Sequence, residues 1–236
     1  DLDLANRLPH LKHWISSGEP LPADLCRQFS QRLPDRVLTN LYGTTEIWDA
    51  TRCDSRDRPP GMPLPIGRPM GNVRVYILDP QLRPVPVGVA GELYVGGAGM
   101  ALGYWNRPSL NEEKFIPDPF GSNQQRLYRT GDRTRWLPDG MIEHLGRLDQ
   151  QFKLRGFRIE AGEIEETLRR HPGLVNAAIA VTSKDTFAAY VVPATDPGPS
   201  MEELRNFARI HLPEFMRPAQ WVVLAKLPLT PSGKVD

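Results

Sequence analysis

The segment Tyr42-Gly-Thr-Thr-Glu46 combines side chains that together could bind a nucleotide. Its tyrosine offers an aromatic face for stacking, its glycine lets the backbone approach a ligand closely, and its hydroxyl groups can bind phosphate. The carboxylate of Glu46 could serve as an oxygen ligand for Mg²⁺. Residues of these types also occur in ordinary turns between a strand and a loop, so this segment alone leaves both interpretations open.

Two further segments carry charged side chains beside glycines. In Tyr128-Arg-Thr-Gly-Asp132, the carboxylate could bind a ribose diol through its two oxygens, although Asp beside Gly is usual in plain turns. In Pro231-Ser-Gly-Lys234, the lysine is either a solvated tail residue or a mobile ammonium group. A mobile ammonium group could stabilise negative charge that develops on phosphorus when a domain closes.

Other motifs favour no chemistry. Gly96-Gly-Ala-Gly99 is followed by no Lys-Ser/Thr pair and lacks dinucleotide-binding spacing, so we interpret it as a turn between strands. The five histidines, which include His144, show no metal-ligand spacing. Cys26 and Cys53 match no metal-binding pattern and have no identifiable activating context.

The composition is that of an ordinary globular protein, with 40% hydrophobic and 24% charged residues. A net charge of +1 gives no reason to expect nucleic acid or an anionic membrane surface as a partner. The arginines between Arg126 and Arg135 are interpreted as a solvated strand face. No apolar run reaches membrane-spanning length and the first residues do not resemble a signal peptide, so we expect a cytoplasmic protein.

The hydrophobic pattern changes near Asp149, which predicts two parts, residues 1–149 and 150–236. In the first part, residues 1–60 alternate between α and β signals, and residues 61–148 are mostly β, as in a small barrel or curled sheet. The second part has an α+β pattern.

Local signals within these parts predict individual elements. Four helices are expected, over residues 23–33, from the capping box Ser109-Leu-Asn-Glu112 to Phe115, over residues 162–170, and from the capping box Ser200-Met-Glu-Glu203 to Pro213. Pro138-Asp-Gly140 predicts the turn of a β-hairpin. Val37-Leu38 predicts a buried strand that leads into a loop at Tyr42-Gly43.

Taken in order, four motifs resemble the adenylate-forming superfamily of acyl-CoA synthetases, luciferases and adenylation domains of nonribosomal peptide synthetases. They are Asn40–Glu46, Tyr128–Asp132, Gly146–Gly156 and Pro231–Asp236. The Gly-rich segment Gly91–Pro108, with Glu113-Lys-Phe115 after it, is similar to a signature of the peptide-synthetase branch, as are Gly156–Glu165 and Leu212–Pro218. The resemblance covers nearly the whole chain. It implies a truncated adenylate-forming fold, with a partial α/β subdomain, a β-barrel-like subdomain and a small α+β C-terminal subdomain.

The resemblance also implies a nucleotide site that binds ATP. Asn40 and Tyr42, with Gly43 beside them, would hold and stack the adenine. Asp132 would accept the ribose hydroxyls, assisted by Arg147.

Three residues would act on the reacting groups of the substrates. Thr45 would contact phosphate and Glu46 would help to bind Mg²⁺. Lys234 would meet the substrate carboxylate and the α-phosphate during adenylate formation.

A second half-reaction is implied as well, in which the phosphopantetheine thiol of a peptidyl carrier protein takes the acyl group. Asp149 matches the hinge about which the small subdomain rotates. After that rotation, the loop with Lys153, Arg155 and Gly156 would face the active site. A small accessory protein of the MbtH-like kind is a further expected partner.

Four residues fall where the family places the wall of its amino-acid pocket, namely Ile15, Ser17, Leu41 and Asp49. Asp49 either favours a hydroxyl or ammonium group on the substrate side chain or is a surface carboxylate. The identity of the amino acid is not predicted.

The sequence departs from the family pattern in two respects. Thr44 replaces a usual proline, and neither the upstream phosphate loop nor the upstream substrate-binding aspartate has a counterpart. We therefore expect the later part of an amino-acid-activating domain, inactive alone and without pyrophosphate exchange. The alternatives are a noncatalytic module that docks a carrier or accessory protein, and a free-standing acyl- or aryl-CoA ligase, which the Gly-rich signature disfavours.

Overall fold

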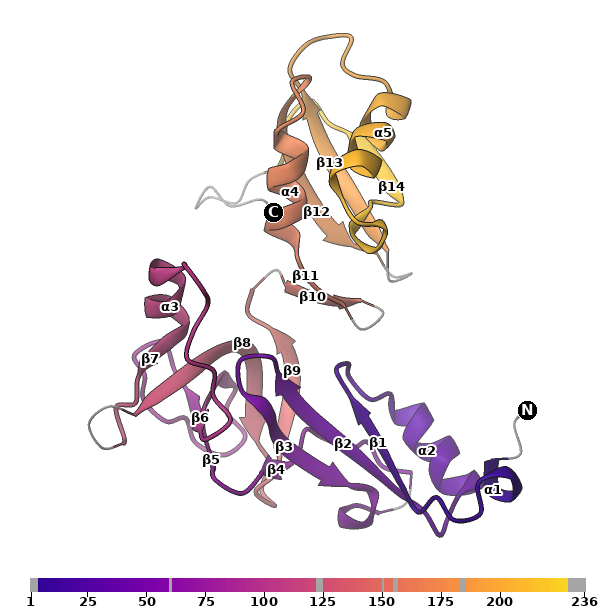
Figure 1. The fold of residues 1–236 in the computed structure, drawn as a ribbon, viewed down its shortest axis with the longest axis vertical. Helices are drawn as coiled ribbons and strands as arrows, with labels where there is room; N and C mark the ends of the chain where they lie inside the picture. The colour runs from indigo at the N-terminus through magenta and orange to yellow at the C-terminus, as the bar shows by residue number, and fades with distance from the viewer. Residues whose placement is uncertain are drawn as a thin grey trace. The chain divides into compact units, whose positions relative to one another are not determined.

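The computed structural model describes residues 4–59, 61–121, 125–149, 151–154, 157–182 and 186–228. The chain divides into two compact units, Asp1–Asp149 and Gln150–Asp236 (Figure 1). We describe each unit separately.

The first unit begins with a four-stranded sheet in the order β1-β2-β3-β4. Its strands are β1 (His13–Ser17), β2 (Val37–Thr44), β3 (Trp48–Asp54) and β4 (Arg68–Pro69). β1 and β2 are parallel, and α2 (Ala23–Arg32) forms the crossover between them, as a parallel pair requires. The other pairs are antiparallel; the short helix α1 (Leu4–Arg7) precedes β1, and η1 (Ser55–Asp57) lies between β3 and β4.

The second sheet of this unit is antiparallel throughout, with β5-β6-β8-β7 in order and β9 paired to β8. Its strands are β5 (Val73–Leu78), β6 (Gly91–Gly97), β7 (Phe115–Pro117), β8 (Arg126–Trp136) and β9 (Ile142–Arg147), and α3 (Pro108–Lys114) leads into β7. The predicted hairpin turn is confirmed, because the Leu137 N–H donates to Met141 O across 2.7 Å and Gly140 has a φ of +78°.

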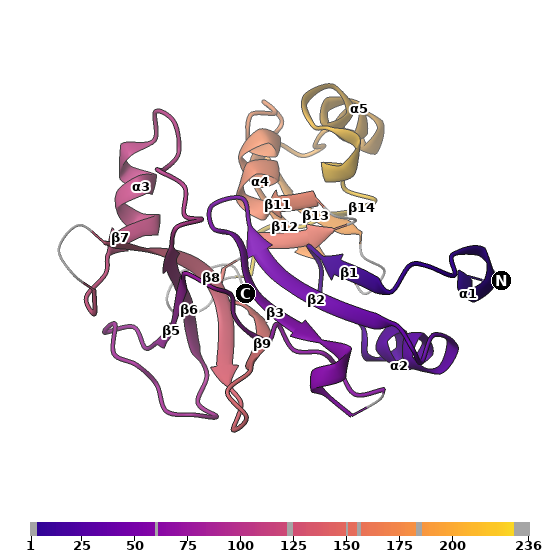
Figure 2. The same cartoon turned by 60° about the horizontal axis from the view of Figure 1, so that its bottom comes forward.

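The two sheets of the first unit share one core. Tyr42, Ile47 and Ala50 of the β2–β3 hairpin pack in the same buried cluster as Leu93 and Tyr128. A β-bridge between Gly67 and Ile142 also joins the two sheets. As a result β2 and β3 lie beside β8 and β9 (Figure 2), and this brings together motifs that are far apart in the sequence.

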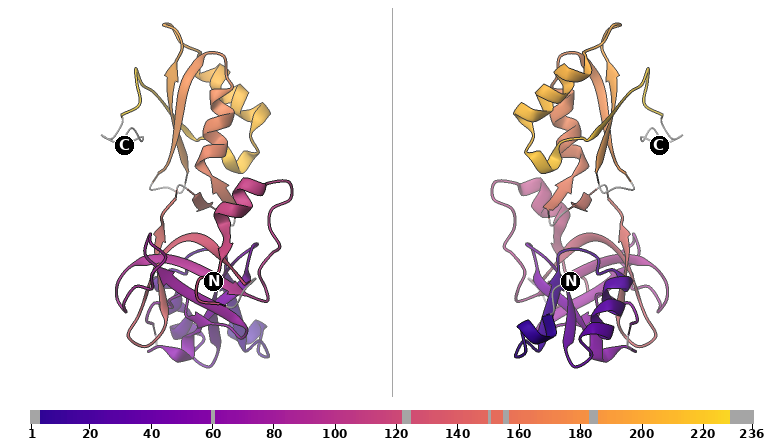
Figure 3. Two further views of the ribbon diagram at one scale, coloured as in Figure 1. Left: turned by 90° about the vertical axis from the view of Figure 1, so that its left-hand side faces the viewer. Right: turned by 90° about the vertical axis from the view of Figure 1, so that its right-hand side faces the viewer.

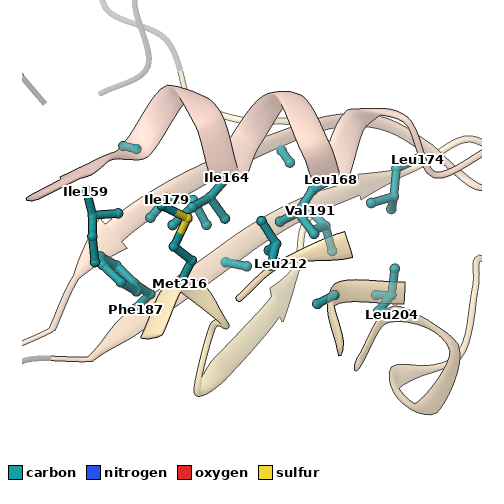
Figure 4. Close-up of a cluster of buried hydrophobic side chains, with 14 residues drawn as sticks. Ile159, Ile164, Leu168, Leu174, Ile179, Phe187, Val191, Leu204, Leu212 and Met216 are labelled. Atoms are coloured by element: carbon teal, nitrogen blue, oxygen red, sulfur yellow. The ribbon is translucent and has the colours of Figure 1, made fainter. Parts of the chain in front are cut away.

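The second unit pairs a hairpin with an α+β core. The hairpin is β10 (Gln151–Leu154) and β11 (Phe157–Glu160). The core contains α4 (Ala161–Arg169), β12 (Leu174–Val181), β13 (Phe187–Pro193), α5 (Met201–His211), η2 (Glu214–Met216) and β14 (Gln220–Val223), with the sheet order β12-β13-β14. Both α4 and α5 lie on one side of this sheet (Figure 3). The helices and the sheet pack together through a cluster of buried side chains that includes Ile164, Leu168, Phe187, Val191 and Leu204 (Figure 4).

The two capping-box predictions have opposite outcomes. Ser200 is confirmed as the N-cap of α5, because its Oγ accepts the Glu203 N–H at 3.2 Å while Glu203 Oε2 accepts the Ser200 N–H at 2.7 Å. The capping box at Ser109 is wrong. α3 starts at Pro108, whose fixed φ suits the first helical position, and Arg107 is an N-cap without a side-chain hydrogen bond.

The predicted loop at Tyr42-Gly43 is also wrong, because β2 continues to Thr44 and the turn follows it at residues 45–47. Among the described residues, none of the helices combines the length and the apolar character needed to span a membrane.

Candidate functional site

The β2–β3 hairpin positions the first motif, and Gly43 allows its shape. A Cβ atom at position 43 would lie 2.8 Å from the carbonyl carbon of Trp48 and 2.9 Å from Asp49 Cα. The register shifts between Tyr42 and Gly43, and Trp48 has a positive φ of 57°. The two strands of the hairpin therefore approach each other closely at a β-bulge, and only glycine leaves room for this approach. The bulge determines the positions of Tyr42 and Glu46.

The carboxylate of Asp132 is the centre of a buried hydrogen-bond network. Asp132 is only 2% exposed. The hydroxyl of Tyr42 donates to its Oδ2, and the guanidinium of Arg147 donates to its Oδ1 at 2.8 Å. His144 Nε2 lies 3.1 Å from the same Oδ1. Three strands, β2, β8 and β9, thus converge on one carboxylate.

Arg147 links Asp132 to Asp149. Its Nε and Nη2 donate to the two carboxylate oxygens of Asp149, both at 2.7 Å, in a bidentate pair. Nη2 also donates to Thr130 O at 3.0 Å. One guanidinium therefore holds the buried Asp132 and the last residue of the first unit at the same time.

A second carboxylate supports the strand that carries Asp132. Glu92 on β6 accepts the Gly131 N–H at 3.2 Å and both of its oxygens accept Arg129 Nε, at 2.9 and 3.0 Å. Arg135 pairs with Glu143 at 2.6 Å. These two arginines of β8 pair with glutamates on neighbouring strands, and their side chains are still 44% and 42% exposed, which agrees with the interpretation of a solvated strand face.

The surroundings determine the protonation states of Asp132 and Tyr42. Burial raises the pKa of Asp132, but the hydrogen bond from His144, the charge of Arg147 and the hydrogen bond from Tyr42 outweigh it and lower that pKa below its usual value. Burial, followed by the nearby Asp132 charge, raises the pKa of Tyr42 well above its usual value. At neutral pH the pair is therefore a phenol that donates to a carboxylate.

Glu46 lies in a second polar group, formed with two tyrosines. It is 5% exposed, and its Oε1 accepts the hydroxyl of Tyr104 at 2.5 Å. The hydroxyls of Tyr104 and Tyr128 are 3.3 Å apart. In the described residues no cluster of three or more His, Cys, Asp and Glu side chains could hold a metal ion by itself. A single carboxylate fits Mg²⁺ that is bound mainly through substrate phosphates and water.

The comparisons with known proteins decide the family. A sequence model of AMP-binding enzymes matches residues 2–105, and a model of the C-terminal domain of AMP-binding enzymes matches residues 163–234. The chain belongs to the AMP-binding enzyme family.

Relatives within this family include nonribosomal peptide synthetases. The chain is 46% identical over 228 residues to a dimodular nonribosomal peptide synthase of Bacillus subtilis, a match that covers 94% of this chain and 9% of that protein. Among solved structures, IdnL1 matches with a TM-score of 0.84 and 30% identity, over 95% of this chain and 47% of that one. Holo-PA1221, a peptide-synthetase protein containing adenylation and PCP domains, matches with a TM-score of 0.77 and 29% identity, over 99% of this chain and 42% of that one.

These matches confirm the predicted resemblance and the mixed α/β and α+β fold of adenylate-forming proteins. The chain spans less than half of each of these solved structures and less than a tenth of the dimodular synthase.

The AMP-binding motif residues differ in how the structure uses them. Tyr42 is 6% exposed, and its ring packs in the hydrophobic core. Its hydroxyl donates to Asp132. Asn40 donates both amide hydrogens to backbone carbonyls, those of Leu64 and Pro65, each at 3.0 Å. Thr45 is exposed on the turn. The adenine and phosphate roles of these residues stay predictions.

The residues predicted to line the amino-acid pocket share one face of the first sheet. Ser17 pairs with Leu41 in the parallel register, and Ile15 precedes Ser17 by two positions on the same strand face. Gly43, two positions after Leu41, pairs with Asp49. Ile15 is 68% exposed, so this face is accessible in the described part of the chain.

Other predicted residues lie outside the described residues. These are Arg155, Gly156 and Lys234, and of Lys153 the structure describes only its place in β10, opposite Arg158. The sequence did not indicate His144 and Glu92 around Asp132, or Tyr104 beside Glu46. For His144 the sequence did contain a signal: it lies on the strand that follows the predicted turn, and the hairpin places it opposite Thr134.

Proposed function

We propose that this chain forms part of an amino-acid-activating adenylation domain. In this proposal, residues 1–149 are the later part of the large subdomain and residues 150–236 are the small C-terminal subdomain. The protein that contains the chain would form aminoacyl-AMP from ATP and an amino acid. It would then pass the acyl group to the phosphopantetheine thiol of a peptidyl carrier protein.

The observation that carries the proposal is the buried Asp132 carboxylate, held by Tyr42 and Arg147 where the first three motifs meet. An ionised carboxylate in a largely buried position is a strong acceptor for a ribose hydroxyl, because competing water is scarce. The peptide-synthetase relatives support amino acids as the substrate class and a carrier protein as the partner. The MbtH-like accessory protein stays a prediction from the sequence.

Each residue has a distinct task in the first half-reaction. A carboxylate oxygen of the amino acid attacks the α-phosphorus of ATP, a new P–O bond forms, and pyrophosphate leaves with the electrons of the broken bond. Asp132 holds the ribose and Thr45 donates to phosphate. Mg²⁺, held by Glu46, would supply charge neutralisation at the phosphates. Lys234 would stabilise the charge that develops around the α-phosphorus.

The test separates the two half-reactions in the protein that contains this chain. Lys234→Ala should depress aminoacyl-adenylate formation, measured by pyrophosphate exchange, about 100-fold or more, because it removes a positioned charge from the transition state. Thioester formation from preformed adenylate should change by less than about 3-fold. Lys226→Ala, which removes an exposed lysine of the same unit, is the control and should change neither rate. Equal losses in both half-reactions would contradict the role of Lys234.

A further inference from the structure

His144 occupies a defined place in the Asp132 network that the known motifs do not include. It lies on β9 opposite Thr134 of β8, and its ring is tilted against that of Tyr42 with 6.5 Å between centroids. Nε2 lies 3.1 Å from Asp132 Oδ1, and Nδ1 accepts the Gly146 N–H at 3.3 Å. Because Nδ1 is an acceptor, the neutral ring carries its proton on Nε2 and donates it to Asp132.

The donors around Asp132 determine which of its oxygens a ligand can reach. A carboxylate has about four acceptor positions, two on each oxygen. Arg147 and His144 both donate to Oδ1, whereas Oδ2 accepts from Tyr42. The free acceptor position is therefore on Oδ2, and the carboxylate cannot rotate without breaking charge-assisted hydrogen bonds.

We propose that His144 is a positioning residue that fixes the Asp132 carboxylate with Oδ2 directed to a nucleoside hydroxyl. The inference rests on the proposed function, since it deepens the role of Asp132 in holding ribose. The charged and titratable groups that face His144 are Asp132 of β8, Tyr42 of β2 and, through Asp132, Arg147 of β9. Removing the Nε2 donor leaves Oδ1 held by Arg147 alone and loosens the orientation of the carboxylate.

The experiment compares two nucleotides on the protein that contains this chain, by calorimetric titration. AMP has the ribose hydroxyls and 2′,3′-dideoxy-AMP lacks them. His144→Phe keeps a ring without a donor, and His144→Gln keeps a donor at the reach of Nε2. We expect His144→Phe to weaken AMP binding about fivefold to tenfold, the effect of a loosened hydrogen bond to a charged group. The same variant should change dideoxy-AMP binding less than about twofold, and His144→Gln should restore most of the AMP affinity.

The outcomes separate positioning from packing. If His144→Phe weakens both nucleotides equally, or if His144→Gln binds AMP no better than His144→Phe, the role is structural and the inference is wrong. ¹⁵N NMR of the free wild-type chain provides a test without nucleotide, because a neutral His144 ring with its proton on Nδ1 would also overturn the inference. Failure of the wild-type protein that contains this chain to bind AMP, with the Nε2–H form present, would instead overturn the proposed function.

Discussion

Replacing Arg147 by methionine tests whether Asp132 depends on its arginine for stability. Methionine keeps an apolar stem of similar length and removes the guanidinium. Arg147 is 11% exposed at its side chain and Asp132 is 2% exposed, so the change leaves a buried carboxylate without its cation. Removing one partner of a buried ion pair costs about 3–5 kcal/mol.

The local geometry places the expected cost near the lower end of that range. Tyr42 and His144 still donate to Asp132 in the variant, which limits the loss. The pair with Asp149 adds little, because the Asp149 side chain is 34% exposed and solvent screens its charge. We therefore expect Arg147→Met to destabilise the first unit by about 3 kcal/mol.

The assay is native-state hydrogen exchange on peptides from β8 and β9, which reports the first unit separately from the second. Arg135→Met is the matched control, since Arg135 pairs with Glu143 across the same two strands but their side chains are 42% and 37% exposed. Its expected cost is about 0–1 kcal/mol. Peptides of α4 and β12 should not change in either variant. If Arg147→Met costs no more than Arg135→Met, the argument that Asp132 needs a buried cation is refuted.

Two other predictions follow from the same region. Gly43→Ala should lower the melting temperature of the first unit by several degrees, because the new Cβ would lie 2.8 Å from the Trp48 carbonyl carbon. Gly71→Ala is the control and should change the melting temperature little, because a Cβ at position 71 has no atom within 4 Å. Asp132 has a lowered pKa in the folded chain, so its stabilising contribution is present above its unfolded pKa of about 3.9 and is lost as the pH falls through the folded value. Urea unfolding between neutral and acidic pH should therefore show a steeper loss of stability in the wild type than in Asp132→Asn, and parallel pH profiles would contradict this.

Elements specified by local chemistry were predictable from the sequence. The capping box at Ser200 and the turn at Pro138-Asp-Gly140 need only residues three or four apart, and both are confirmed. At Ser109 the same pattern failed, because Pro108 next to it is a better first helical residue. The strand through Tyr42 and Gly43 was missed because a bulge and the positive φ of Trp48 have no reliable sequence signal.

The motifs named Tyr42, Asp132 and Arg147, which the structure brings together, but the sequence indicated neither their contacts nor His144. Tyr42 and Asp132 are 90 residues apart, and no spacing rule connects a strand of one sheet to a strand of another. Arg147 and Asp149 are two residues apart in the same motif, so their ion pair is a local contact. His144 was set aside because it shows no metal-ligand spacing, and its partner is a carboxylate that only the β8–β9 register brings near.

The shared guanidinium of Arg147 gives the proposed hinge a physical connection to the proposed nucleotide site. Its bidentate pair with Asp149 and its bond to Asp132 use different nitrogens, and one nitrogen of the pair, Nη2, also reaches Thr130 O. If Asp149 changes its backbone angles during a domain rotation, the planar guanidinium must follow or lose the pair. A substitution at Arg147 should therefore affect both ribose binding and the rotation, whereas a substitution at Asp149 should leave the Asp132 network in place.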